Sequence, residues 1–327
     1  MMESEQKNYG LYGLLLGIAG LLIILLFVTI RSKADDSLPE VDITNQLPTI
    51  SAGPTVNGGN QISPAEYAST QVEILGTYTD NNGCDEVSDG GKVSVYLGRS
   101  GVVSNNACNA DSNNCYTNSS ITMTNGTGSG ADFACTVTGC NGGTDVDGVL
   151  SCLVDLAYYA EPTDTGTYSG ENWNGAIKVQ DGEGYSSWSD NAAELASLAA
   201  LNLTEAAIDY GSLALGATSS ADVALTVKNT GNKILDISYY GTDMTCTDGT
   251  IAYSKQKFDT VAETAYASMT YTLDDDSQDL SSFNLAKATS GQADSTDELY
   301  WRINIPSTGL SGACTGTNTI VAVDGGN

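Results

Sequence analysis

The chain contains no histidine and few basic residues, and each shortage removes a class of function. Without histidine it cannot form Ser-His-Asp or Cys-His nucleophilic sites, and it lacks the commonest zinc and iron ligand. Only 12 lysines and arginines stand against 40 acidic residues, which gives a net charge of −28. Because this negative field repels phosphate backbones, we expect no nucleic-acid partner. The same field attracts cations.

A long uncharged segment stands near the amino terminus. Residues 8–30 carry no charged side chain and are nearly all apolar. About twenty such residues in a helix cross the hydrocarbon core of a bilayer, whereas the apolar part of a signal peptide has only about 7–15. Arg31 and Lys33 come next, as at a boundary with lipid headgroups. We therefore predict a short tail over residues 1–10 and a retained transmembrane helix over residues 11–30, with signal-peptide cleavage as the alternative.

Two further features concern the anchor and the segment after it. Gly13 and Gly17 have the spacing at which membrane helices approach closely, which suggests self-association through this face. Residues 31–66 hold four of the six prolines, and their apolar periodicity is poor. We read them as a Pro/Asp-rich tether between the membrane and the body.

The eight cysteines predict disulfides rather than a metal site. None belongs to a CxxC pair, no histidine is present, and each half of the body holds an even number. Cys246 with Cys314 is the only pairing within the second half. The first half leaves several pairings open, of which we predict Cys108–Cys115, Cys135–Cys140 and Cys84–Cys152. Disulfides require an oxidising compartment, so we expect the body outside the cell, although the charges flanking the helix do not fix its orientation.

The body predicts an all-β fold. Apolar residues alternate along several stretches, such as residues 71–79, 92–100 and 173–181, and turn sequences such as DNNG at 80–83 and DGEG at 181–184 separate them. This spacing is typical of β-sandwiches. We predict two immunoglobulin-like β-sandwich domains, at residues 67–195 and 196–327, after one transmembrane α-helix.

Two stretches resemble known surface modules. VQDGEG, which ends at residue 184, is similar to a late strand of polycystic-kidney-disease-type immunoglobulin-like modules. Residues 208–239 resemble the hydin-like and spindle-associated immunoglobulin-type modules. The matching positions are Ile208, Tyr210, Gly211, Gly216, Val223, Leu225, Val227, Asn229, Thr230 and Gly231. This second resemblance implies a sandwich and a non-enzymatic role. In residues 208–239 we expect Val223, Leu225 and Val227 to form one buried face of a strand. Asn229 and Gly231 would supply the turn that follows this strand.

Two oxygen-rich turns are candidate calcium sites, because Ca²⁺ prefers carboxylate and amide oxygens. The turn at residues 108–118 lacks the distal glutamate and sixth-position glycine of an EF-hand loop. For both turns, ordinary turn chemistry, in which Asp and Asn bind their own backbone, is the alternative. No other cofactor is expected. The candidate ligands are Asp80, Asn82 and Asp85 in one turn and Asn109, Asp111 and Asn113 in the other.

These observations predict a non-enzymatic, membrane-anchored cell-surface protein of the cell envelope, with a structural or adhesive role. Its partners would be surface proteins or glycans. One alternative is a pilin-like filament subunit whose apolar helix packs in a fibre core, although the sequence lacks the glutamate expected in such a helix. Another is a glycoside hydrolase that uses a pair of carboxylates, which the sequence does not single out.

Overall fold

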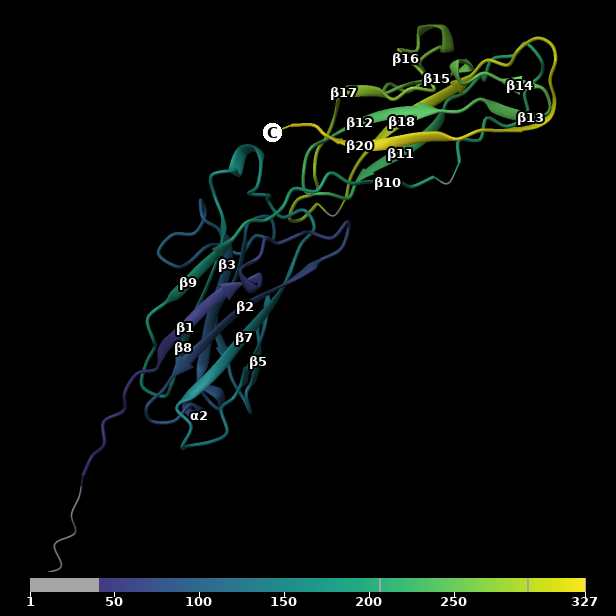
Figure 1. Ribbon diagram of the computed structural model, residues 1–327. Coiled ribbons are helices and arrows are strands. Elements are labelled where there is room, and N and C mark those ends of the chain that lie inside the picture. The colour runs from purple at the N-terminus through teal and green to yellow at the C-terminus, as the bar shows by residue number, and fades with distance from the viewer. Residues whose placement is uncertain (1–40, 206, 293, 327) are drawn as a thin grey trace, which may run out of the picture. The chain divides into compact units, whose positions relative to one another are not determined.

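The computed structural model describes residues 41–205, 207–292 and 294–326, and residues 45–327 form one compact unit. All sheet ladders in this part are antiparallel, which confirms the predicted all-β class (Figure 1). The predicted tail and transmembrane helix lie outside the described residues, as do Gly13 and Gly17. Within the described ranges, no helix combines the length and the apolar character that a membrane span needs.

Two sheets face each other in the first half of the body (Figure 1). The first contains, in spatial order, β1 (Thr49–Val56), β2 (Thr70–Thr79), β7 (Asp147–Leu156), β6 (Phe133–Thr138) and β5 (Thr127–Ser129). The second contains β4 (Cys115–Thr122), β3 (Lys92–Arg99), β8 (Trp173–Gln180) and β9 (Ser189–Ala193). Short helical turns connect some of these strands: η1 (Asn57–Gly59), α2 (Asp85–Ser88) and η2 (Gly166–Tyr168).

One hydrophobic core fills the space between these two sheets. Every second residue of β2 points inward, so Val72 and Ile74 are completely buried. They belong to the same cluster as Val95 of β3 and as Trp173 and Ile177 of β8. The alternation seen in the sequence therefore marks the buried face of each sheet, since successive side chains of a strand point to opposite sides.

The predicted tether over residues 31–66 is wrong for residues 49–56, which form strand β1. Residues 49–56 were expected in the irregular segment 31–66, but they pair with β2 along the edge of the sheet. The strand contains Pro54, and its register shifts twice. An edge strand tolerates a proline because one side of its backbone needs no ladder partner. The proline and glycine hid the strand pattern that the rest of the segment would have shown.

Two of the four predicted disulfides are wrong. Cys108–Cys115 and Cys246–Cys314 are present, but Cys84 pairs with Cys140 and Cys135 with Cys152. Residues 135 and 152 face each other across β6 and β7. From Cys135 the extended strand runs to residue 138, about 10 Å away, whereas a disulfide needs Cα atoms within about 7 Å. Proximity in sequence therefore misled the prediction for Cys135 and Cys140.

The predicted Cys84–Cys152 pair fails for the same physical reason. Residue 152 lies opposite Ile74 in the middle of the sheet, and β2 continues for five residues beyond that point to Thr79. Five extended residues span about 16 Å. Cys84, which comes after the end of β2, is therefore too far along the sheet to reach Cys152. It reaches the loop that connects β6 to β7 instead.

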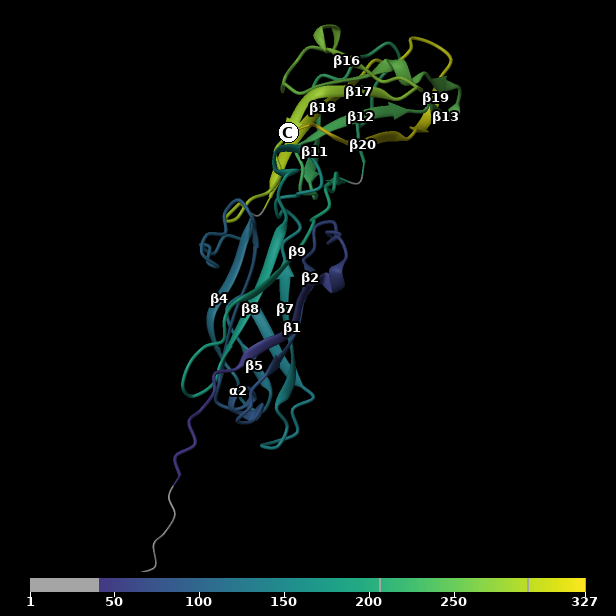
Figure 2. The same cartoon turned by 60° about the vertical axis from the view of Figure 1, so that its left-hand side comes forward.

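Three sheets build the second half of the body (Figure 2). One contains β10 (Leu201–Leu203), β11 (Val223–Asn229), β18 (Ser295–Ile303), β15 (Gln256–Asp259) and β16 (Tyr271–Thr272). Another contains β17 (Gln278–Leu285), β12 (Leu235–Gly241) and β20 (Asn318–Asp324), and the smallest contains β14 (Thr250–Ile251), β13 (Met244–Asp248) and β19 (Ser311–Thr315). Two short turns complete it: η3 (Tyr253–Lys255) and η4 (Tyr266–Ser268).

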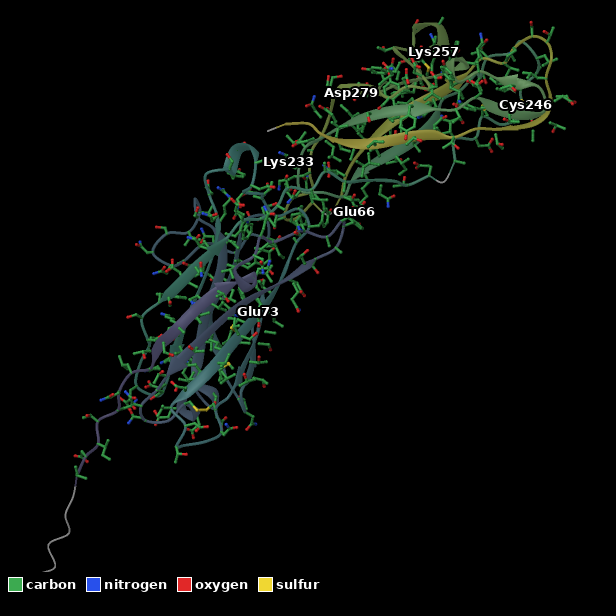
Figure 3. The ribbon with its side chains drawn as sticks, viewed as in Figure 1. Glu66, Glu73, Lys233, Cys246, Lys257 and Asp279 are labelled. Carbon is green, nitrogen blue, oxygen red and sulfur yellow. A yellow bond between two sulfur atoms is a disulfide. The ribbon has the colours of Figure 1, made fainter. Side chains whose placement is uncertain are left out.

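The core of this half joins the first two of these sheets. Leu225 and Val227 of β11 and Trp301 of β18 pack in one cluster with Leu235 and Ile237 of β12. The predicted buried face of β11 and the resumption of the sheet at β12 are both present. Cys246, which is labelled in Figure 3, lies on β13 directly opposite Cys314 on β19. The disulfide between them links these two strands of the small sheet.

The turn between β11 and β12 is stabilised by Asn229, as predicted. This side chain is fully buried, and its amide nitrogen donates to the carbonyl oxygens of Lys233 at 2.8 Å and Ala286 at 3.0 Å. Gly231 has a different role from the expected one, because its backbone φ is not in the left-handed region. A Cβ there would lie 2.1 Å from the carbonyl oxygen of Leu198, so close approach of the backbone requires the glycine.

The same turn also binds the segment that leads into the second half. The amide group of Asn232 accepts from the backbone N–H of Leu198 at 2.7 Å and donates to the carbonyl of Ala196 at 3.0 Å. The buried ammonium group of Lys233 (Figure 3) pairs with Asp324 at 3.0 Å. Two bonds cross to the first half: the hydroxyl of Thr230 donates to Oε1 of Glu66 at 2.8 Å, and Nζ of Lys233 donates to the hydroxyl oxygen of Thr165 at 3.3 Å.

Candidate functional site

Two aspartate-led turns, a hundred residues apart in sequence, meet at one end of the first sandwich. Asp80 comes directly after the last residue of β2, and Asp181 directly after the last residue of β8. Together with Glu86 of α2, they place one carboxylate oxygen each within 4.8 Å of the other two. We call Asp80, Glu86 and Asp181 the acidic trio.

Each aspartate of the trio uses one oxygen to shape its own turn. Oδ1 of Asp80 accepts from the backbone N–H of Asn82 at 3.0 Å, and Oδ1 of Asp181 accepts from the N–H groups of Glu183 and Gly184, both at 2.8 Å. This is the usual way in which an aspartate fixes a turn. It leaves Oδ2 of both residues available for a further partner.

The remaining oxygens have unequal surroundings. Oδ2 of Asp181 accepts from the side-chain Nδ2 of Asn45 at 2.8 Å. Oδ2 of Asp80 is buried and has no hydrogen-bond partner among the described residues, and the same holds for Oδ1 of Asn45. The Asp80 side chain is completely inaccessible to solvent, Asp181 is 3% exposed, and Glu86 is exposed. The trio therefore has a buried floor of two carboxylates and one carboxylate at its solvent side.

Several bonds hold this end of the sandwich in place. The Cys84–Cys140 disulfide ties the start of α2 to the loop between β6 and β7, and the backbone N–H of Asp80 donates to the carbonyl of Val146 at 2.7 Å in the same loop. The hydroxyl of Tyr78 donates to the carbonyl of Cys84 at 2.8 Å. Figures 1 and 2 both show α2 at the end of the sandwich where the chain enters it. The trio therefore sits on a fixed frame.

The charged neighbours that shift the pKa values of Asp80 and Glu86 oppose ionisation of both groups. Burial raises the pKa of Asp80, and the charges of Asp181 and Asp85 raise it further, against hydrogen bonds from backbone N–H groups that lower it. Desolvation also raises the pKa of Glu86, followed by the charges of Asp80 and Asp181. Every charged neighbour that shifts these two pKa values is negative. A cation bound between them would relieve this repulsion.

The structure brings together only part of the first predicted calcium turn. Asp80 belongs to the trio, whereas Oδ1 of Asn82 accepts the backbone N–H of Gln46 at 2.7 Å. Asp85 lies on α2 and acts on the trio through its charge. The sequence reasoning missed Glu86 and Asp181 as partners. The signal that could have found Asp181 is the repeated Asp-x-x-Gly pattern, which occurs in both turns.

The second predicted calcium turn shows ordinary turn chemistry. Oδ1 of Asp111 accepts both the backbone N–H of Asn113 at 3.0 Å and its side-chain Nδ2 at 2.7 Å. The side-chain oxygen of Asn113 accepts in turn from the backbone N–H of Ser290 at 3.2 Å. Asn109 is exposed. These bonds stabilise the loop closed by the Cys108–Cys115 disulfide, and the acidic trio does not extend to it.

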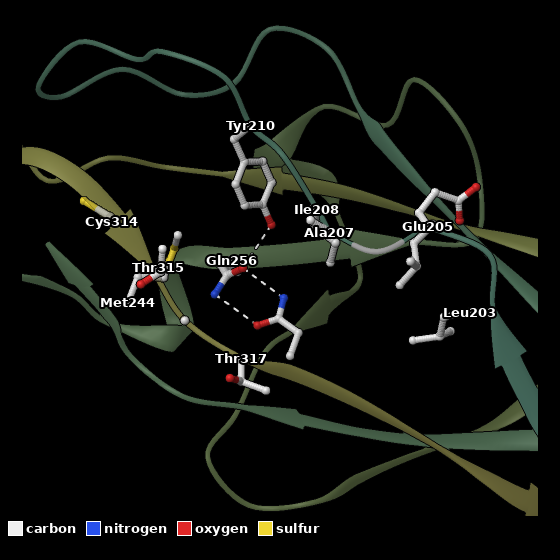
Figure 4. Close-up of a pocket in the computed structure, with 13 residues that line it drawn as sticks. Leu203, Glu205, Ala207, Ile208, Tyr210, Met244, Gln256, Cys314, Thr315 and Thr317 are labelled. Atoms are coloured by element: carbon white, nitrogen blue, oxygen red, sulfur yellow. Dashed lines mark hydrogen bonds between the residues drawn. The ribbon is translucent and has the colours of Figure 1, made fainter.

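A cavity of about 400 Å³ lies in the second half of the body, beside β19 and β20 (Figure 4). Its polar floor is a closed set of hydrogen bonds. The hydroxyl of Tyr210 donates to Oε1 of Gln256 at 3.0 Å, and the amides of Gln256 and Asn318 bind each other at 3.0 and 3.3 Å. Burial raises the pKa of Tyr210, so its hydroxyl stays a donor at neutral pH. These groups bond to one another and stiffen the floor.

The carboxylate at the rim of this cavity has a structural role. Glu205 accepts from the backbone N–H of Thr226 and from the hydroxyls of Thr204 and Thr226, and these bonds lower its pKa. It thereby attaches the chain after β10 to β11. A carboxylate engaged in this way is poorly placed to act as a general acid.

Comparisons with known proteins assign neither a family nor a function to the chain. No family model and no curated protein sequence matches the chain. Among solved structures, the native conformation of Escherichia coli alpha-2-macroglobulin is similar over 84% of this chain and 17% of its own length, with 10% identity and a TM-score of 0.21. The chain thus spans about a sixth of that protein. A TM-score this low gives no evidence about the function of the chain.

Proposed function

We propose that this chain is a membrane-anchored cell-surface protein with a structural or adhesive role, which displays two immunoglobulin-like β-sandwich domains outside the cell. The observation that carries the proposal is the state of the cysteines. All eight lie in the described part of the chain, and they form four disulfides that leave none free. Such a set forms and persists in oxidising compartments and is rare in the cytosol.

Two other observations support the proposal. The uncharged run over residues 8–30 is long enough for a membrane helix, which would attach the body to the cell. In the cavity of Figure 4, the side chains of Tyr210, Gln256 and Asn318 hydrogen-bond to one another, as expected of a structural core. A structural or adhesive role needs stable, displayed surfaces, which disulfide-linked β-sandwiches provide.

The experiment that tests this function is protease accessibility on intact cells. The full chain carries an epitope tag at its carboxyl terminus and is produced in a host with an oxidising cell exterior. We expect externally added proteinase K to remove the tag from intact cells while a cytoplasmic marker stays intact. Alkaline carbonate should leave the untreated protein in the membrane pellet, and deletion of residues 11–30 should release it. A tag that becomes accessible only after cell lysis contradicts the proposal.

A further inference from the structure

We propose that the acidic trio binds one Ca²⁺ ion, and that this ion fastens the first residues of the compact unit to the end of the sandwich. The donor set is made of hard oxygen ligands only. It lies where residues 45 and 46 enter the unit. The inference does not depend on where in the cell the protein resides.

The spacing of the trio suits calcium. Ca²⁺ binds oxygens at about 2.3–2.6 Å, so two ligands on opposite sides of the ion lie about 5 Å apart. One oxygen from each residue of the trio lies within 4.8 Å of the others, which a single Ca²⁺ can span. Mg²⁺ demands a near-ideal octahedron at about 2.0–2.1 Å and keeps several of its waters, so converging carboxylates and amide oxygens suit the more flexible coordination of Ca²⁺ better. The chain has no histidine and no free cysteine, so ions that prefer nitrogen or sulfur lack their ligands.

A second and independent observation points to a ligand. Asp80 is completely buried, and its Oδ2 has no hydrogen-bond partner among the described residues. A buried carboxylate oxygen without a partner is costly, because neither water nor a donor replaces its lost hydration. Its carboxylate belongs to the group that converges within 4.8 Å. A cation at that point supplies the missing partner and cancels the repulsion from Asp181.

The amide of Asn45 links the trio to the incoming chain. Its Nδ2 donates to Oδ2 of Asp181, and its buried Oδ1 is without a partner among the described residues. Since the two amide atoms share one carbon, this oxygen also lies near Asp181, and a small rotation of the amide would let it serve as a neutral ligand. The exposed carboxylate of Glu86 leaves a solvent-facing side, where the ion can enter and waters can complete the six to eight ligands that Ca²⁺ takes.

The neighbouring residue shows what the ion would hold. The backbone N–H of Gln46 donates to Oδ1 of Asn82 at 2.7 Å, and its Oε1 accepts from Nδ2 of Asn81 at 2.8 Å. Both asparagines belong to the turn that Asp80 begins. An ion that binds Asp80, Asp181 and Asn45 therefore joins the two turns and the entering chain. Without it, mutual repulsion of the carboxylates weakens the same contacts.

Isothermal titration calorimetry on the full chain, purified in detergent, tests the site with CaCl₂ and, separately, MgCl₂. The main variant is Glu86→Gln, because this side chain is exposed and its replacement keeps shape while removing one charge. The matched control is Asp111→Asn in the other predicted calcium turn. We expect one Ca²⁺ per chain, at least about tenfold weaker affinity in Glu86→Gln, and unchanged affinity in the control. Absence of Ca²⁺ binding, equal affinity in Glu86→Gln, or loss of binding in Asp111→Asn each overturns the site.

Amide hydrogen exchange tests the fastening separately. At a Ca²⁺ concentration that fills the wild-type site but leaves Glu86→Gln largely unoccupied, Ca²⁺ should slow exchange of the Gln46 amide in the wild-type chain and leave it nearly unchanged in Glu86→Gln. Near-ultraviolet circular dichroism in a chelating buffer serves as the folding control, and the two proteins should give the same spectrum there. Binding of Ca²⁺ with unchanged exchange at Gln46 overturns the fastening role. Neither result bears on the protease test of the proposed function, so the two proposals fail independently.

Discussion

The disulfide between Cys135 and Cys152 gives a direct test of the architecture of the first sandwich. Its two Cα atoms are 4.0 Å apart on neighbouring strands, and both side chains are buried in the core. The double variant Cys135→Ala/Cys152→Ala removes this bond and leaves six cysteines. If the observed pairing holds, those six remain paired. If the pairing were the one favoured by sequence proximity, the variant would instead leave Cys140 and Cys84 without partners.

The magnitude can be worked out from the length of the closed loop. A disulfide restricts the unfolded chain, and for a sequence separation of 17 residues this restriction is worth about 3 kcal/mol. For a domain of this size, each kcal/mol shifts the melting temperature by roughly 2–4 °C. The double variant should therefore melt about 6–12 °C below the wild type. The corresponding Cys84→Ala/Cys140→Ala variant opens a separation of 56 residues, worth about 4 kcal/mol, and should lose somewhat more.

The assay combines thiol counting with thermal unfolding. One sample of each purified variant is unfolded in guanidinium without reductant, and its free thiols are titrated with a thiol reagent. A second, folded sample of the same variant is heated, and its unfolding is followed by circular dichroism. Zero free thiols in both double variants is the expected result. Two free thiols in Cys135→Ala/Cys152→Ala would refute the pairing and, with it, the register of β6 against β7. An unchanged melting temperature together with zero thiols would refute the loop-entropy reasoning alone.

Three further predictions concern single residues. Asn229→Ala leaves the buried carbonyls of Lys233 and Leu285 without this donor and should lower the free energy of unfolding by about 2–4 kcal/mol in urea titrations. The change at exposed Asn202, Asn202→Ala, should alter it by less than about 0.5 kcal/mol. Gly231→Ala forces a Cβ against a backbone carbonyl and should lower the melting temperature, while Gly170→Ala, which meets open space, should not; equal melting of the two would contradict the close approach. In chelating buffer, Asp80→Asn should stabilise the fold at pH 7, and Ca²⁺ should no longer raise its melting temperature. Folding raises the pKa of Asp80, so the charged carboxylate destabilises the folded state, fully so at a pH above the raised pKa. This penalty disappears as the pH falls toward the ordinary pKa of an aspartate. If Asp80→Asn is less stable than the wild type in chelating buffer, the charge of Asp80 does not destabilise the fold.

Much of the fold could be predicted because strand patterns are local. The alternation in residues 71–79, 92–100 and 173–181 corresponds closely to β2, β3 and β8, and the predicted buried face around Leu225 is part of the second core. A strand with one buried face imposes a period of two on its own sequence, whatever its partners are. By contrast, β1 was missed because it combines a proline, a glycine and two register shifts. Edge strands face weaker constraints and carry a weaker pattern.

The candidate site was found only in part for a related reason. Asp80 was singled out because its turn is rich in oxygen ligands, but Glu86 and Asp181 come from a helix and from a turn a hundred residues away. Nothing in local sequence says which loops share one end of a sandwich. The facing of two sheets decides it. The same holds for the role of Gly231, whose neighbour Leu198 approaches only in the folded chain.

Composition and short-range order were enough to establish the class of the body and the kind of chemistry open to it. Absent histidine, excess carboxylates, an even number of cysteines in each half and alternating strands restrict the ligands and the fold without any knowledge of contacts. Folding in three dimensions then settled which cysteines pair, which carboxylates converge and which buried oxygens have no partner among the described residues. Those relations join residues that are distant along the chain, and the distance between them is set by how the sheets pack.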